Sequence, residues 1–118
     1  MTKNEVRKLN IMYQQLLLER CGYESILGGE ATLIHHWKQG RGQAVIWHFP
    51  MGIPLTAEQH NDIHLGNKAG EEYNKIIIKI KGDKWLSDME IRKWKSIKYH
   101  ITYDKVLRYF KGRAKDYI

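Results

Sequence analysis

The pattern of apolar and polar positions first predicts an amphipathic helix near the N-terminus. Over residues 4–20, apolar side chains recur at helical spacing, and charged or amide side chains fill the positions between them. The apolar positions are Val6, Leu9, Tyr13, Leu16 and Leu17. We expect this helix to pack its apolar face on the rest of a small core; a helix that dimerises is the alternative.

Residues 31–66 predict two strands followed by a helix. Residues 31–34 and 44–49 are short apolar runs on either side of a loop that contains glycine. Farther along, Thr56 and Gln59 form the sequence pattern of a capping box, and Gly66 stands where a left-handed residue ends many helices. We therefore expect strand, loop, strand and helix in that order.

The C-terminal part predicts further helices. Residues 71–81 fit either a helix or a strand, and we favour a helix because no hairpin partner follows. A second capping box at Ser87 and Glu90 predicts a helix to about residue 98, and residues 102–111 form a last one. In the helix from Ser87, the expected inward residues are Ile91, Trp94 and Ile97, and the expected outward residues are Arg92, Lys93 and Lys95.

These elements predict an α+β fold in one domain of residues 1–118. A small strand–strand–helix unit takes about residues 31–66, and the remainder of the domain is mainly helical. The N-terminal helix covers about residues 4–20, and a basic helical part covers about residues 69–112. A chain of 118 residues is large enough for one modest core but not for a separate substrate domain.

The net charge of +7 indicates a polyanionic partner. Residues 1–67 hold six Lys or Arg and six Asp or Glu, whereas residues 68–118 hold fourteen and seven, so the whole excess follows the strand–strand–helix unit. Nucleic acid is the natural partner, and a basic surface that serves only solubility is the alternative. The single cysteine excludes an internal disulfide, which fits a reducing cytoplasm. No apolar stretch is long enough to predict a membrane span.

Five of the six histidines lie in residues 31–66. His35 and His36 are expected at the end of the first strand. His60 and His64 are four residues apart, so on a helix they share one face and can bind one ion together. If the hairpin folds back, the two pairs meet at a metal site; scattered surface histidines are the alternative reading.

This segment resembles the His-Asn-His (HNH) nuclease motif, also called the ββα-metal finger. It is similar to colicin-type DNase motifs, which also begin with two adjacent histidines and close with an H-x-x-x-H helix, here His60-Asn61-Asp62-Ile63-His64. The run Ile53-Pro54-Leu55 resembles RecA-dependent phage nucleases and other phage HNH proteins. The resemblance covers roughly a third of the chain. It implies a metal-dependent endonuclease that hydrolyses DNA phosphodiester bonds in phage or mobile-element DNA processing.

The resemblance implies a role for each histidine. His35, His60 and His64 would bind one divalent metal ion, which stabilises the phosphorane and the 3′ leaving oxygen, and His36 would be the general base that activates water. The central Asn of the motif has no counterpart at the aligned position, which is Met51; the nearest polar alternatives are His48 and Asn61. Three imidazoles favour Zn²⁺, Ni²⁺ or Mn²⁺ over Mg²⁺, although many HNH nucleases work with Mg²⁺.

Several basic residues are candidates for holding DNA phosphates. They are Lys38, Arg41, Lys68, Arg92, Lys93 and Lys95. For Lys38 and Arg41, exposed charges on a turn are the alternative. The expected partner is DNA, duplex, branched or single-stranded, with phage or host recombination and replication proteins as further partners. The expected location is the cytoplasm, that of the host cell if the protein is viral. Two other functions stay open: a catalytically degenerate nucleic-acid-binding protein, and a metal-binding structural or accessory phage protein.

Overall fold

The computed structural model describes residues 1–37, 46–95 and 101–112, with the side chains of residues 93–95 excluded. Its elements in chain order are α1 (Lys3–Arg20), β1 (Leu33–His36), the 3-10 helix η1 (Phe49–Met51), β2 (Gly52–Leu55), α3 (Ala57–Leu65), α4 (Lys68–Lys81), α5 (Asp83–Lys95) and α6 (Tyr103–Phe110). The fold therefore mixes helix and strand and is mostly helical. In the part of the chain described, no helix is long and apolar enough to cross a membrane.

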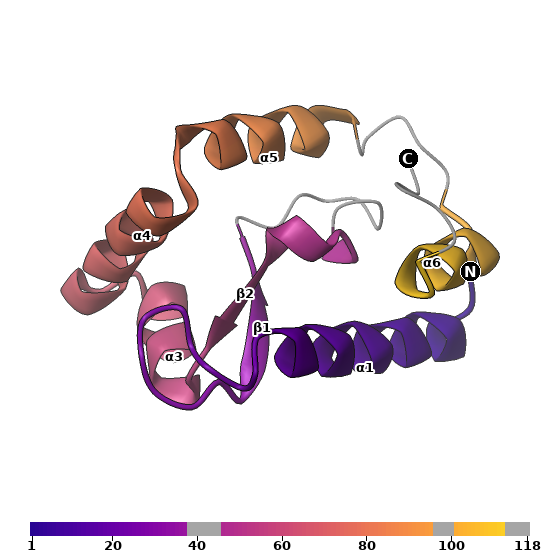
Figure 1. Cartoon of the computed structure of the whole chain (residues 1–118), viewed down its shortest axis with the longest axis horizontal. Helices are drawn as coiled ribbons and strands as arrows, with labels where there is room; N and C mark the ends of the chain where they lie inside the picture. The colour runs from indigo at the N-terminus through magenta and orange to yellow at the C-terminus, as the bar shows by residue number, and fades with distance from the viewer. Residues whose placement is uncertain (38–45, 96–100, 113–118) are drawn as a thin grey trace.

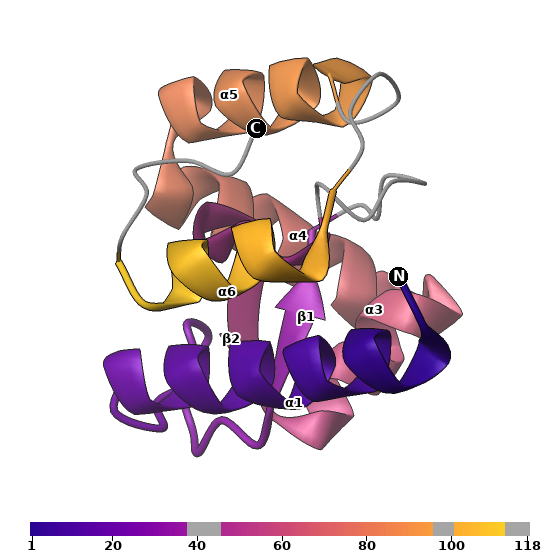
Figure 2. The ribbon, with the colours of Figure 1, turned by 90° about the vertical axis from the view of Figure 1, so that its right-hand side faces the viewer.

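A two-stranded antiparallel sheet lies at the centre of the molecule (Figure 1). β1 and β2 pair with Leu33 opposite Leu55 and His36 opposite Gly52. Helices α3, α4 and α5 follow a curved path around one side of this hairpin, whereas α1 and α6 lie on the other side (Figures 1 and 2). Because successive side chains of a strand point to opposite faces, each face of the hairpin packs against a different set of helices.

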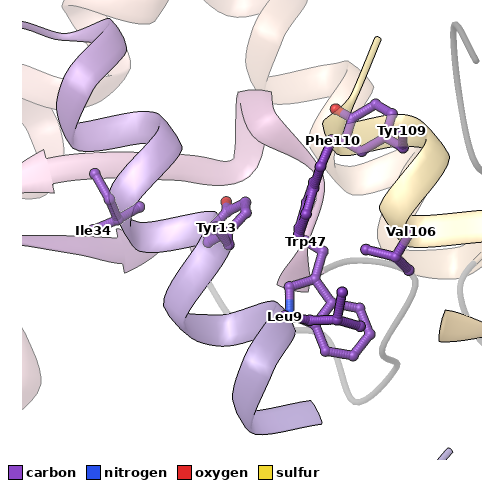
Figure 3. Close-up of a cluster of buried hydrophobic side chains, with 7 residues drawn as sticks. All are labelled: Leu9, Tyr13, Ile34, Trp47, Val106, Tyr109 and Phe110. Carbon is purple, nitrogen blue, oxygen red and sulfur yellow. The ribbon is translucent and has the colours of Figure 1, made fainter. Parts of the chain in front are cut away.

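Two clusters of buried side chains occupy these two faces. The first joins α1, β1 and α6, with Leu9 and Tyr13 packed among residues of the other elements (Figure 3). The second joins the hairpin to α4 and α5 and contains Ile53, Leu55 and Ile77. Trp47 is 0% exposed in the first cluster and Trp37 is 2% exposed in the second, which confirms both tryptophans as core residues.

Most of the helices expected from the sequence are confirmed. α1 begins at a capping box between Thr2 and Glu5. In α3, the side chain of Thr56 accepts from the N–H of Gln59, the side chain of Gln59 accepts from the N–H of Thr56, and Gly66 ends the helix at φ 65°. Residues 71–81 lie in α4, and α6 begins after Thr102. Local capping chemistry therefore located α3 correctly, whereas α1, α4 and α6 were located by their apolar pattern.

The expected second strand at residues 44–49 is wrong where it can be compared. Residues 44 and 45 lie outside the described residues, Trp47 and His48 are not in a strand, and Phe49 begins η1. The second strand is β2, a few residues later, and β1 also begins two residues later than expected, so that it contains both histidines. In the described part of this run, Trp47 is buried in a turn and its indole N–H donates to Asn10 Oδ1 at 2.9 Å, whereas Ile46 and Phe49 are partly buried.

The orientation expected for the helix at residues 87–98 is also wrong. α5 already begins at Asp83, so Ser87 lies inside the helix and does not cap it. Ile91 is 55% exposed, whereas Met89 is 4% and Arg92 is 9% exposed. The inward face follows Trp85, Met89 and Arg92, which are spaced four and three residues apart and pack toward the hairpin and α4. Trp94 and Ile97 lie outside the described side chains.

Candidate metal centre

Three histidines from two elements converge on one point. His35 comes from β1, and His60 and His64 come from α3, one helical turn apart. One ring nitrogen of each histidine lies within 4.8 Å of the corresponding nitrogens of the other two. The His60 and His64 rings are closest, with their Nε2 atoms 2.8 Å apart and one ring donating to the other. The His35 ring lies edge-on to both, at centroid distances of 5.2 Å and 5.5 Å.

The local sequence explains this convergence. His35 stands opposite Ile53 in the hairpin and points to the face on which α3 lies, because strand residues alternate between faces. At the other end, Gln59 fixes the start of α3: its Nε2 donates to the carbonyl of Gly28 at 2.9 Å, and its Oε1 accepts from the hydroxyl of Ser25. The residue that completes the capping box therefore also attaches the histidine helix to the loop before β1.

Burial lowers the pKa of two of these imidazoles, His35 and His60. The pKa of His35 falls from 6.5 to about 4, mainly because burial disfavours the charged ring and secondarily because of His60, His64 and His36 nearby. Burial also lowers the pKa of His60, with a smaller contribution from His64. A neutral imidazole is the form that binds metal, so at neutral pH little proton release is needed for an ion to bind.

The donor set fits a borderline divalent metal. Three imidazole nitrogens, with no carboxylate in the cluster among the residues that the structure describes, suit Zn²⁺ or Ni²⁺ better than Mg²⁺, which prefers oxygen. Two nitrogens bound to one tetrahedral zinc ion lie about 3.4 Å apart, given Zn–N distances of about 2.0–2.1 Å. The Nε2 atoms of His60 and His64, 2.8 Å apart, are slightly closer than this, and the three ligand nitrogens spread over up to 4.8 Å, which is wider. Rotations of the rings would bring the three nitrogens to the spacing of a site.

His36 lies on the opposite face of the hairpin. β1 contains the two histidines as its last two residues, as expected from the sequence, and the His36 ring stacks on Tyr13 with a centroid distance of 5.3 Å and an interplanar angle of 9°. Burial lowers the pKa of His36, a hydrogen bond to the backbone carbonyl of Ile46 partly raises it, and His60 lowers it further. Its Nε2 is buried without a hydrogen-bond partner among the described residues.

Three aromatic side chains hold the backbone that leads into β2. Tyr13 donates its hydroxyl to the carbonyl of His48 at 3.0 Å, and the Tyr109 hydroxyl accepts from the N–H of Phe49 at 2.9 Å. Trp85 donates its indole N–H to the carbonyl of Pro50 at 2.8 Å. These contacts come from α1, α6 and α5, and sequence reasoning missed them because periodicity does not reveal tertiary hydrogen bonds.

The residue aligned with the motif's missing Asn and its two nearest polar alternatives lie in different surroundings. Met51 is buried in the second core cluster. His48 Nδ1 lies 3.4 Å from the Tyr109 hydroxyl, and Asn61 is exposed on α3. In the part that the structure describes, His48 therefore lies beside Tyr109 of α6.

The predicted phosphate-binding residues have different outcomes. Lys68 is exposed at the first position of α4. Arg92 is buried, so the expectation that it faces outward is wrong. Lys38 and Arg41 lie outside the described residues, as do the side chains of Lys93 and Lys95.

Comparison with protein-family models, with curated proteins and with solved structures finds no match to this chain.

Proposed function

We propose that this protein is a metal-dependent endonuclease of the HNH type that hydrolyses phosphodiester bonds of DNA. The observation that carries the proposal is the convergence of His35, His60 and His64 in a strand–strand–helix arrangement, with a fourth histidine next to His35 in the chain. The net charge of +7 supports a polyanionic substrate.

Each histidine has a distinct task in this proposal. The three converging imidazoles hold the ion, which when bound supplies positive charge to a phosphate. In this role His36, whose ring stacks on Tyr13 on the other face of the hairpin, would have to reach the attacking water past the end of β1 to accept its proton. The Ile46 carbonyl that accepts from one ring nitrogen keeps the proton there, so Nε2, which has no described partner, is left as the proton acceptor.

Single substitutions separate the ligand role from the base role. His64→Ala should weaken Zn²⁺ or Ni²⁺ binding, and excess metal should restore part of the nicking of supercoiled plasmid. His36→Ala should keep metal affinity within a few fold and lower the nicking rate by about 10²–10⁴-fold, the usual contribution of a positioned base. Calorimetric metal titration and plasmid nicking measure the two effects. Leu65→Ala, at an exposed neighbour of His64 on α3, is the control and should change neither.

A nucleic-acid-binding protein without cleavage is the second candidate. The observations that favour it are the buried Nε2 of His36 and the apolar Met51 where the motif has an Asn. Metal-dependent DNA binding without nicking, across Mg²⁺, Mn²⁺, Zn²⁺ and Ni²⁺ and on linear, supercoiled, branched and single-stranded DNA, would support it. Metal binding without DNA affinity would instead support an accessory metal-binding protein.

A further inference from the structure

Gln14 of α1 binds the strand that carries His35. Its Oε1 accepts from the backbone N–H of Ile34 at 2.7 Å, and its Nε2 donates to the carbonyl of the same residue at 3.0 Å. A primary amide has one donor and one acceptor side, so it can replace the edge of a neighbouring strand in this way. The helix thus supplies β1 with the hydrogen bonds of a third strand at one position.

The register of the hairpin leaves this position open. Ile34 and Pro54 form a non-hydrogen-bonded pair of the antiparallel ladder, so both backbone groups of Ile34 point away from β2, and the missing N–H of Pro54 costs the ladder no hydrogen bond. Without Gln14, both groups would face the half-buried contact between α1 and β1. Leaving such a pair unsatisfied costs free energy, so the contact fixes the backbone of Ile34 firmly.

Ile34 is joined directly to His35. The carbonyl that Gln14 holds belongs to the peptide plane whose nitrogen is that of His35, so its orientation determines where the His35 ring meets His60 and His64. Around metal sites, side chains that only orient a ligand typically change metal affinity by about 10–100-fold.

We propose that Gln14 is a positioning residue for the metal centre and acts through His35. The inference rests on the metal site proposed above, but not on cleavage of DNA. Co²⁺ is the probe, because its absorption bands report both affinity and ligand geometry in a histidine site.

The test compares Gln14→Met and the isosteric Gln14→Glu with Gln15→Met. Gln15 is the neighbouring residue of α1, is exposed, and donates its Nε2 hydrogen to Glu19 Oε1 at 3.4 Å. Gln14→Met should weaken Co²⁺ binding by about 10–100-fold and change the absorption bands. Gln14→Glu keeps an acceptor for the Ile34 N–H but loses the donor, so it should also weaken binding. Gln15→Met should stay within twofold of the unsubstituted protein.

A double-mutant cycle with His35→Ala identifies the route of the effect. If Gln14 acts through His35, then Gln14→Met should cause no further loss of Co²⁺ affinity in the His35→Ala background. Two results would overturn the proposal. One is an equal loss of Co²⁺ affinity on Gln14→Met in both backgrounds. The other is a Gln14→Met variant whose Co²⁺ affinity and absorption bands are unchanged and whose unfolding temperature alone is lower. If circular dichroism shows that Gln14→Met does not fold, the Co²⁺ affinity and absorption bands of Gln14→Glu decide instead.

The outcomes also separate this inference from the proposed nuclease. Co²⁺ binding that depends on Gln14, in a protein that never nicks DNA, would refute the nuclease and leave the positioning role standing. No Co²⁺ binding by the unsubstituted protein would refute both.

Discussion

Two adjacent histidines have different surroundings because strand residues alternate between faces. His35 is 8% exposed and faces two histidines of α3, whereas His36 stacks on Tyr13 of α1. The two histidines are adjacent in the chain, yet they differ in their neighbours, in their hydrogen bonds and in the roles proposed for them.

The lowered pKa of His35 gives a pH dependence to the stability of the metal-free protein. Its pKa is about 4 when folded and 6.5 in the unfolded chain, so between these values the unfolded state takes up the proton first. The stabilising effect of the neutral ring is complete above pH 6.5 and is lost as pH falls toward 4. Urea unfolding in EDTA at pH 7 and pH 5 should show a smaller loss for His35→Gln than for the unsubstituted protein. Identical losses would contradict this assignment.

At the scale of elements, α3 and α4 pack closely at one glycine. A Cβ built at Gly70 would overlap the carbonyl oxygen of Asp62 and lie 2.9 Å from Ile63 Cα. These contacts are backbone atoms, which cannot rotate away as a side chain can. The closeness of the two helices thus depends on the missing side chain.

Gly70→Ala should therefore destabilise the protein, although alanine favours helix by about 1 kcal/mol over glycine. Overpacking typically costs about 1–3 kcal/mol, so we expect a net loss of up to about 2 kcal/mol in the free energy of unfolding. Chemical denaturation measures it. Ala69→Ser also adds one heavy atom to α4, at an exposed position, and should change the free energy by less than about 0.5 kcal/mol. Greater stability of Gly70→Ala would show that the helices can separate freely.

The helices were more predictable than the strands for a physical reason. Capping at Thr56, Asn67 or Thr102 involves residues three positions apart, so it can be recognised from the local sequence. β2 contains Gly52 and Pro54, both poor strand formers, and is a strand only because β1 pairs with it. In the run just before it, Trp47 is buried instead by tertiary packing, and Ile46 and Phe49 are partly buried beside it.

The histidine cluster was predictable in part. The i,i+4 spacing of His60 and His64 and the turn before them indicated a shared site with His35, and the three rings do converge. The support from Gln14 was not predictable, since a polar residue beside an apolar helical stripe is normally exposed to water. The opposite orientation of His36 follows from its place as the last residue of β1, one position after His35.

At the scale of the whole molecule, the positive charge is unevenly distributed along the chain. The excess lies entirely in residues 68–118, of which α4 and the start of α5 present exposed lysines. Within α4, Lys75 forms an ion pair with Glu72 at 3.3 Å. Lys68, Lys79 and Lys84 are exposed as well and lie on a surface that a polyanion can reach.

Replacing Lys68, Lys79 and Lys84 by Gln should weaken DNA binding similarly for unrelated sequences. The slope of log K against log salt should fall by about 0.9 for each phosphate that these lysines neutralise. Fluorescence anisotropy in EDTA, at several salt concentrations, measures this without cleavage. Lys3, Arg7 and Lys8, replaced together, remove the same charge from exposed positions of α1 and should leave the slope nearly unchanged. If the slope of log K against log salt is the same for both triple variants, the positive charge of the C-terminal part serves solubility and not DNA binding.

The alternation of His35 and His36 has a consequence for folding fidelity. A hairpin slipped by one residue would turn His36 toward α3 in place of His35, so a divalent ion could stabilise the wrong pairing almost as well as the right one. The residues beside the two histidines distinguish the native from the slipped pairing, because the slip would move Ile34 and Trp37 out of the clusters in which each is buried. Correct pairing is therefore selected by the apolar residues beside the doublet, and metal added during refolding should not improve the yield of native hairpin.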